Sequence, residues 1–166
     1  MRTLALFLLA AALVTASASA ASPRAKVLVR VTSVGGVLAD GRGHTLYSYA
    51  VDKGRVPACY GACASLWPPF LTSAMPIAGV GAKAKLIGTT KRKDGKLQVT
   101  YAGHPLYFFS GDAKAGQIKG QGYQSSWWAL AASGAKVKKT PATTSTTPPP
   151  PTTTTVPGYG DGNGGY

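Results

Sequence analysis

Two segments of this 166-residue chain repeat each other: GHTLYSYAVD at residues 43–52 and GHPLYFFSGD at residues 103–112. The same offset of 60 residues aligns Trp67 with Trp127, and each Trp follows a glycine-containing loop. Self-similarity at one fixed offset is typical of duplicated structural units, and two copies are too few for an open solenoid. We therefore predict one domain that consists of two related, pseudo-symmetric β units packed together.

Each copy has the composition of a β-strand. Aromatic and aliphatic side chains fall on both faces of residues 44–49 and 104–109, so neither face can be left in water without exposing a large apolar area. The dipeptide Asp94-Gly95 separates two further β-like runs and predicts a hairpin, because both turn positions tolerate positive φ. We predict a mainly β, antiparallel domain with repeats at about residues 35–80 and 95–135.

The composition argues against helical bundles and against several kinds of enzyme. The chain has no Glu, five Asp, 21 Gly and 12 Pro, so it lacks the capping boxes and Glu–Lys pairs that support exposed helices. It also has neither a Gly-x-Ser-x-Gly elbow nor a His-x-x-x-His metal spacing. A paired-carboxylate glycosidase would have to use Asp52 and Asp112, which occupy the same turn position. We predict that the protein is not an enzyme.

The N-terminal segment is typical of a secretory signal peptide. Arg2 is followed by an apolar run from Leu4 to Val14 and then by Ala18-Ser19-Ala20, so we expect residues 1–20 to be removed. The apolar run is well short of the ~20 residues that span a bilayer. We expect no transmembrane segment after signal cleavage.

The C-terminal segment differs sharply from the rest of the chain. Residues 140–166 contain nine Thr, six Pro and five Gly and no Lys or Arg, which predicts a disordered tail. The predicted folded domain is then residues 21–139.

The motif Tyr-x-aromatic-x-x-Asp occurs at residues 47–52 and 107–112, and the segment CYGACASLWPP lies at 59–69. With KGQG at 119–122, these segments resemble bacterial secreted proteins and predicted lipoproteins that carry this motif in repeats, over residues 35–134. The resemblance implies a secreted or envelope location and a repeat fold more than it implies a chemistry. No Cys lies near the predicted cleavage site, so we expect no lipid anchor.

The motif side chains form the first candidate binding set. Their rings could stack on a sugar or another planar ligand, but aromatic residues at a spacing of two more often fill a core, where each contributes about 1.5–3 kcal/mol. An Asp at a strand end is well placed to accept backbone N–H bonds and close a turn. The set comprises Tyr47, Tyr49, Asp52, Trp67, Tyr107, Phe109, Asp112 and Trp127.

Cys59 and Cys63 are the only cysteines of the chain. In an exported protein a disulfide is the expected state, and a spacing of four residues suits one helical turn. Such a bridge would fix the approach to Trp67-Pro68-Pro69. The alternatives are a redox-active pair or metal ligands, and a Cys-x3-Cys spacing is common for neither.

His44 and His104 are the only histidines, and they occupy equivalent positions in the two copies. A pseudo-twofold axis could bring them together to hold copper or haem iron, with Met75 as a third ligand. Duplication alone also explains the pair without any ligand.

Positive charge is concentrated in the predicted domain. Residues 21–139 carry 17 Lys and Arg against four Asp, with six of the cations between Lys83 and Lys96 and three more at Lys136, Lys138 and Lys139. Such a surface attracts polyanions, which outside a cell include anionic envelope polymers and acidic polysaccharide. No specific nucleic-acid motif is present.

These observations favour a secreted, non-catalytic binding or structural protein of the cell envelope or the extracellular space. The alternative is a metal- or haem-binding accessory protein that uses the two histidines. In the first case no cofactor is expected, and in the second the cofactor is copper or haem.

Overall fold

The computed structural model describes residues 24–139. The predicted signal peptide and the predicted tail from residue 140 lie outside the described residues. In chain order the elements are β1 (Lys26–Thr32), β2 (Gly35–Asp40), β3 (Tyr47–Tyr49), α1 (Ala62–Leu66), β4 (Leu71–Thr72), β5 (Ile77–Ala78), η1 (Ala84–Leu86), β6 (Ile87–Lys91), β7 (Leu97–Tyr101), β8 (His104–Pro105), η2 (Tyr123–Ser125) and β9 (Trp127–Ala129). The prediction of a mainly β fold is therefore confirmed.

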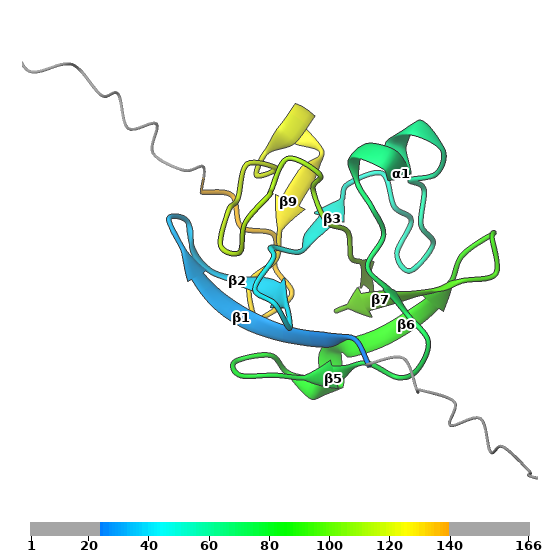
Figure 1. Cartoon of the computed structure of the whole chain (residues 1–166), viewed down its shortest axis with the longest axis horizontal. Coiled ribbons are helices and arrows are strands. Elements are labelled where there is room, and N and C mark those ends of the chain that lie inside the picture. The colour runs from blue at the N-terminus through cyan, green and yellow to red at the C-terminus, as the bar shows by residue number, and fades with distance from the viewer. Residues whose placement is uncertain (1–23, 140–166) are drawn as a thin grey trace, which may run out of the picture.

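Two hairpins, β1–β2 and β6–β7, are the longest paired strands (Figure 1). β5 extends the first hairpin in the order β2-β1-β5, and β4 extends the second in the order β4-β7-β6, with β8 also paired to β7. The short strands β3 and β9 pair with each other. The pairs are antiparallel as predicted, except that β5 runs parallel to β1, with Lys26 opposite Ile77.

The two motif copies meet directly at a pseudo-twofold axis. The backbone N–H of Tyr47 donates to the carbonyl of Tyr107 at 2.9 Å, and the N–H of Tyr107 donates to the carbonyl of Tyr47 at 2.9 Å. This exchange of bonds between equivalent residues is the pattern of an antiparallel hydrogen-bonded pair. The axis that relates the two repeats therefore passes between the two motif tyrosines.

The repeats also exchange the segments that follow their Trp residues. The N–H of Leu38 in the first repeat donates to the carbonyl of Leu130 in the second at 2.8 Å. The equivalent bond runs from the N–H of Val99 in the second repeat to the carbonyl of Phe70 in the first, also at 2.8 Å. Each hairpin is therefore completed by a segment of the other repeat, so neither repeat has all its pairing partners within itself.

Two apolar clusters fill the interior. One lies among the hairpins and includes a symmetric pair of fully buried leucines, Leu46 and Leu106. The other contains the motif rings at Tyr47 and Tyr107 together with both repeat tryptophans. The second cluster thus spans both repeats and joins them.

The local predictions hold at the hairpin and are too long at the motif. Gly95 has a φ of 81°, and the N–H of Arg92 donates to the carbonyl of Lys96 at 2.9 Å across the predicted turn. The strand predicted at residues 44–49 is shorter, since β3 begins at Tyr47 and Thr45 forms only an isolated bridge to Ala39. Turns on both sides of each motif copy limit the length over which it can pair.

Candidate functional site

The side chains that the two motif copies share form a pair of reciprocal hydrogen bonds between the copies. The hydroxyl of Tyr47 donates to Asp112 Oδ2 at 2.6 Å, and the hydroxyl of Tyr107 donates to Asp52 Oδ1 at 3.2 Å. The Tyr of each motif therefore binds the Asp of the other motif. We call these two contacts the reciprocal Tyr–Asp pairs.

Each Asp of these pairs also closes its own loop. Asp52 Oδ1 accepts the N–H of Ala58 at 2.8 Å, and Asp112 Oδ1 accepts the N–H of Lys119 at 2.8 Å. The carboxylates therefore hold the turns that the sequence predicted, and they link the repeats in addition. The sequence did not indicate this second role, because it does not say which copy supplies the partner of each Asp.

The motif rings form a continuous stack across the two repeats. Trp67 and Trp127 lie parallel with ring centroids 3.9 Å apart, Tyr49 stacks on Trp127 at 4.1 Å, and Phe109 packs on Trp67 at 4.5 Å. A Cβ on Gly120 would lie 2.7 Å from the Trp67 ring, so the KGQG segment provides a glycine where the ring needs room.

Four of the motif rings are out of reach of a ligand, whereas Tyr49 and Phe109 are partly exposed. Tyr47 and Tyr107 have no exposed surface, and Trp67 and Trp127 are 2% and 3% exposed. A sugar or planar ligand could not stack on them without opening the core. Burial therefore favours the structural interpretation of the motif over the binding one.

Burial also changes the acidity of the reciprocal pairs. It raises the pKa of Asp52 to about 6, although the N–H of Ala58 and the hydroxyl of Tyr107 oppose the change. Asp52 Oδ2 is buried without a hydrogen-bond partner, which is consistent with a carboxyl group that is costly to ionise. Burial raises the pKa of Tyr47 and Tyr107 as well, so both phenols keep the proton that they donate.

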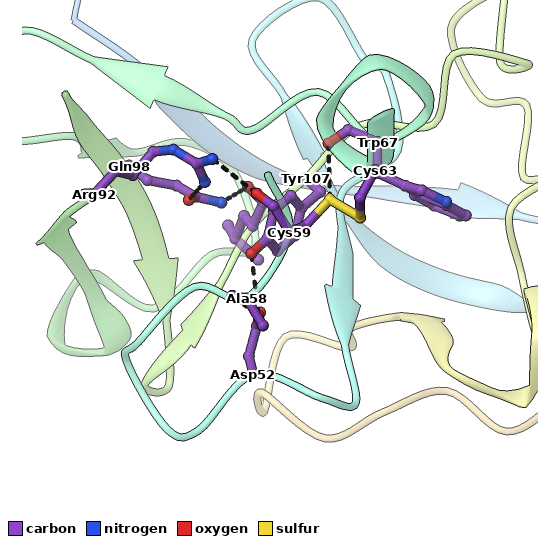
Figure 2. Close-up of a disulfide and its surroundings, with 9 residues drawn as sticks. Asp52, Ala58, Cys59, Cys63, Trp67, Arg92, Gln98 and Tyr107 are labelled. Atoms are coloured by element: carbon purple, nitrogen blue, oxygen red, sulfur yellow. Dashed lines mark hydrogen bonds between the residues drawn. A yellow bond between two sulfur atoms is a disulfide. The ribbon is translucent and has the colours of Figure 1, made fainter. Parts of the chain in front are cut away.

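The predicted disulfide between Cys59 and Cys63 is present, with Cα atoms 5.3 Å apart (Figure 2). It lies at the start of α1, and Cys59 has no exposed surface. The carbonyl of Cys59 accepts the guanidinium of Arg92 at 2.8 Å. The bridge therefore fixes a loop to which the second hairpin is bonded.

Arg92 is an exception to the cationic surface that was predicted to include the segment from Lys83 to Lys96. It is only 4% exposed, it donates to Gln98 Oε1 at 2.6 Å, and its guanidinium lies 4.3 Å from the ring centroid of Tyr60. Its side chain is part of the interior, because the β6–β7 hairpin turns this position towards the disulfide loop (Figure 2). The five lysines of that segment are exposed.

The two histidines have different surroundings. His44 follows β2, and its Nδ1 lies 3.7 Å from Asp40 Oδ1. His104 is in β8, where burial lowers its pKa and the nearby ammonium group of Lys136 lowers it further. Within residues 24–139 no three or more His, Cys, Asp or Glu side chains are grouped as a metal site would need, and Met75 is 60% exposed. The metal or haem role of the histidines stays a prediction.

Two neighbouring pockets share Asp40 and Arg42. The first has a volume of about 320 Å³ and the second of about 440 Å³. The first is lined by Asp40, Arg42, His44, Thr45, Pro68, Phe108, Phe109, Ser110 and Asp112, and the second by Arg24, Ala25, Lys26, Asp40, Gly41, Arg42, Phe70 and Leu71. We call them together the Arg42 groove.

Sequence reasoning missed most residues of the Arg42 groove. Arg42 belongs to a turn directly before the first motif copy, and Phe108 lies between two motif positions. Arg42 is a cation at a turn, and Phe108 is an aromatic residue at a position where the motif does not require one. These are the two features of the sequence that could have pointed to a binding site here. Only the folded chain brings them to one surface.

The surface of the described domain is strongly cationic. Fifteen of its 17 Lys and Arg side chains are exposed, whereas Asp94 is the only exposed side chain among the four Asp of residues 24–139. The other acids are held in turns or in the reciprocal Tyr–Asp pairs. None of the described helices is long and apolar enough to cross a membrane.

Comparison with known proteins gives one family match. A family model described as a secreted repeat of unknown function matches residues 29–70 and 88–131, which is just over half of the chain. Each matched segment contains one motif copy and ends in one of the exchanged segments. No curated protein and no solved structure matches the chain.

Proposed function

The chain belongs to this family of secreted repeats of unknown function, and from that premise we propose that it is a non-catalytic binding protein of the extracellular space or the cell envelope. Its ligands in this proposal are anionic polymers, which it holds on its cationic surface. The proposal has to explain why so small a domain carries a formal charge of +13.

The observation that carries the proposal is the separation of the two signs of charge. The exposed cations have almost no acidic neighbours, since the one ion pair of a Lys or Arg within residues 24–139 joins the buried Arg92 to Asp94 at 3.7 Å. An excess of one sign over the whole surface produces a positive potential that attracts polyanions from a distance. It also opposes compaction of the folded chain, so a polymer that neutralises it would stabilise the protein.

The experiment is co-sedimentation of the purified protein with cell envelopes and with insoluble acidic polysaccharide. We expect strong binding at low salt and loss of binding at about 0.5 M NaCl, where the screening length is roughly 4 Å. A neutral polysaccharide of the same length is the control and should not retain the protein. Binding that is unchanged at the higher salt, or equal on the neutral polymer, would contradict the proposal.

A variant series tests the same point from the side of the protein. Replacing the exposed Lys91, Lys93 and Lys96 by Gln removes three positive charges from the β6–β7 hairpin and leaves the buried Arg92 in place. The salt concentration at which the protein is released should fall. Replacement of Thr72, Thr89 and Thr90 by Ser changes neither charge nor turn geometry and serves as the matched control.

A further inference from the structure

We propose that the Arg42 groove is a specific binding site for an acidic pyranose polysaccharide, with sugar rings against its apolar wall and their carboxylates on its cations. This inference rests on the proposed function and assigns one site and one ligand class to it. A polymer held by surface charge alone would have no preferred position.

The first step is the size and continuity of the groove. Its two pockets, of about 320 Å³ and 440 Å³, share the side chains of Asp40 and Arg42. Volumes of about 300–1,000 Å³ are typical of sites for small organic ligands. Two such pockets side by side suit neighbouring units of a linear polymer better than they suit one compact ligand.

The second step is the charge of the groove. Arg24, Lys26 and Arg42 line the second pocket, and the one acid there is Asp40. Asp40 Oδ1 already accepts the N–H groups of Arg42 and His44, at 2.9 Å and 2.8 Å, because it closes the turn between β2 and β3. In the first pocket Asp112 is a second acid, and its carboxylate accepts the Tyr47 hydroxyl and the N–H of Lys119. Within the described residues the three cations form no ion pair with a carboxylate, so a bound carboxylate in the second pocket would face an excess of positive charge.

The third step is the apolar wall. The first pocket is lined by Pro68, Phe108 and Phe109, and Phe70 lines the second. The rings of Phe108 and Phe70 pack edge to face with centroids 5.2 Å apart, so the wall continues from one pocket into the other. Apolar surface with a few well-placed polar groups is the usual lining of a small-molecule site. The C–H face of a pyranose ring can pack against such a wall, whereas a polyphosphate chain has no apolar surface to pack there.

The fourth step is that the second repeat has no equivalent site. At an offset of 60 residues, Arg24, Lys26 and Arg42 correspond to Ala84, Leu86 and Ala102. Of the two acids in the lining, Asp40 corresponds to Tyr101, since Asp40 lies opposite Val27 and Tyr101 opposite Ile87, and Asp112 corresponds to Asp52. The symmetry-related surface therefore keeps one acid and lacks the three cations. The proposal therefore predicts one site per chain.

The experiment is calorimetric titration of the full secreted protein with a galacturonate tetramer at low salt. A neutral galactose tetramer and inorganic polyphosphate of similar length are the comparison probes. We expect one saturable site for galacturonate and none for the neutral sugar. Binding of polyphosphate without a defined stoichiometry would be consistent with contact to the general cationic surface.

Matched variants then locate the site. Arg42→Gln should weaken galacturonate binding by about tenfold, which is about 1.4 kcal/mol, whereas Arg55→Gln, outside the groove, should change it less than about twofold. Lys26→Gln and the exposed Lys91→Gln form a second pair with the same expectation. Phe108→Leu keeps apolar volume but removes the ring, so it should weaken galacturonate binding and leave polyphosphate binding unchanged.

The outcomes separate the two proposals. Equal losses from Arg42→Gln and Arg55→Gln would overturn the groove and leave surface binding of polyanions standing. Tight polyphosphate binding with no galacturonate binding would overturn the sugar class. Absence of binding to galacturonate, polyphosphate and envelopes alike would overturn the proposed function as well. Thermal unfolding of each variant shows whether it folds. If Arg42→Gln does not fold, the comparison of Lys26→Gln with Lys91→Gln tests the groove instead.

Discussion

Replacing Tyr47 by Phe should cost the protein about 3 kcal/mol of unfolding free energy, because this residue makes the shorter of the two reciprocal Tyr–Asp pairs. Its hydroxyl donates to the buried carboxylate of Asp112 at 2.6 Å and also accepts the N–H of Gly120 at 3.3 Å. A hydrogen bond to a charged group is worth about 1.5–3 kcal/mol and a neutral one about 1 kcal/mol. Asp112 is 8% exposed, so water cannot readily replace the lost donor.

Tyr107→Phe is the matched comparison, because it removes the equivalent hydroxyl from the other repeat. That hydroxyl lies 3.2 Å from Asp52 Oδ1, which keeps the N–H of Ala58 at 2.8 Å when the phenol is lost. The longer contact and the half-buried carboxyl predict a cost of about 1 kcal/mol. Both variants should therefore have a lower unfolding free energy than the wild type, and the loss should be about 2 kcal/mol larger for Tyr47→Phe than for Tyr107→Phe.

Urea unfolding followed by tryptophan fluorescence measures both costs, since Trp67 and Trp127 lose their stacked, buried surroundings on unfolding. A double-mutant cycle with Asp112→Asn isolates the contact itself, and it should show a coupling well above the roughly 0.5 kcal/mol at which independent sites add. If Tyr47→Phe costs less than Tyr107→Phe, or if its effect simply adds to that of Asp112→Asn, the reciprocal pairs do not join the repeats as described.

Three further predictions concern the surroundings of the motif. Arg92→Lys should lower the unfolding free energy by about 2–4 kcal/mol, because one ammonium cannot replace the buried guanidinium bonds to Gln98 Oε1 and the Cys59 carbonyl. The control is Lys93→Gln at an exposed position, which should leave the unfolding free energy almost unchanged in the same urea titration. The raised pKa of Asp52 means that the native state is favoured when this carboxyl is protonated. The resulting contribution to the unfolding free energy is complete below about pH 4 and is lost as the pH rises through about 6. The unfolding free energy of the wild type relative to Asp52→Asn should therefore fall over that range, and a difference that stays constant with pH would contradict this prediction. Replacing Cys59 and Cys63 together by Ser should cost about 2 kcal/mol, the value for closing so short a loop, and an unchanged urea midpoint would show that the bridge does not hold this loop.

Much of the fold follows from features that are local in the sequence. The offset between the two copies predicted the duplication, Asp94-Gly95 predicted the hairpin, and the spacing of Cys59 and Cys63 predicted the disulfide. Each of these signals depends on a turn, a short loop or a direct repeat. Such signals survive without knowledge of the rest of the chain.

The exchange between repeats could not be predicted in the same way. The sequence does not show whether Leu38 pairs with Phe70 of its own repeat or with Leu130 of the other, because both segments are apolar and both follow a Trp. The choice is made by the axis between Tyr47 and Tyr107, which places each motif copy against the other. A sequence repeat identifies the two units, but it does not show which unit supplies the segment that pairs with each hairpin.

The candidate sites show the same limit. Arg92 stands among lysines and carries no mark of burial in the sequence, yet Gln98 and the Cys59 carbonyl hold it inside. Arg42 and Phe108 are 66 positions apart, and their common pocket exists only because the two repeats meet. Sequence reasoning therefore identified the residues that build the core more readily than those that form a surface site.

The most direct test of the whole account is a map of the ligand contact by amide chemical shifts. The protein, labelled with ¹⁵N, is titrated with the galacturonate tetramer at low salt, and the backbone and indole N–H signals are followed. We predict the largest shifts at Arg42, His44 and Phe108, with the indole signals of Trp67 and Trp127 moving least because both rings are buried. Largest shifts at the two indoles would contradict this account.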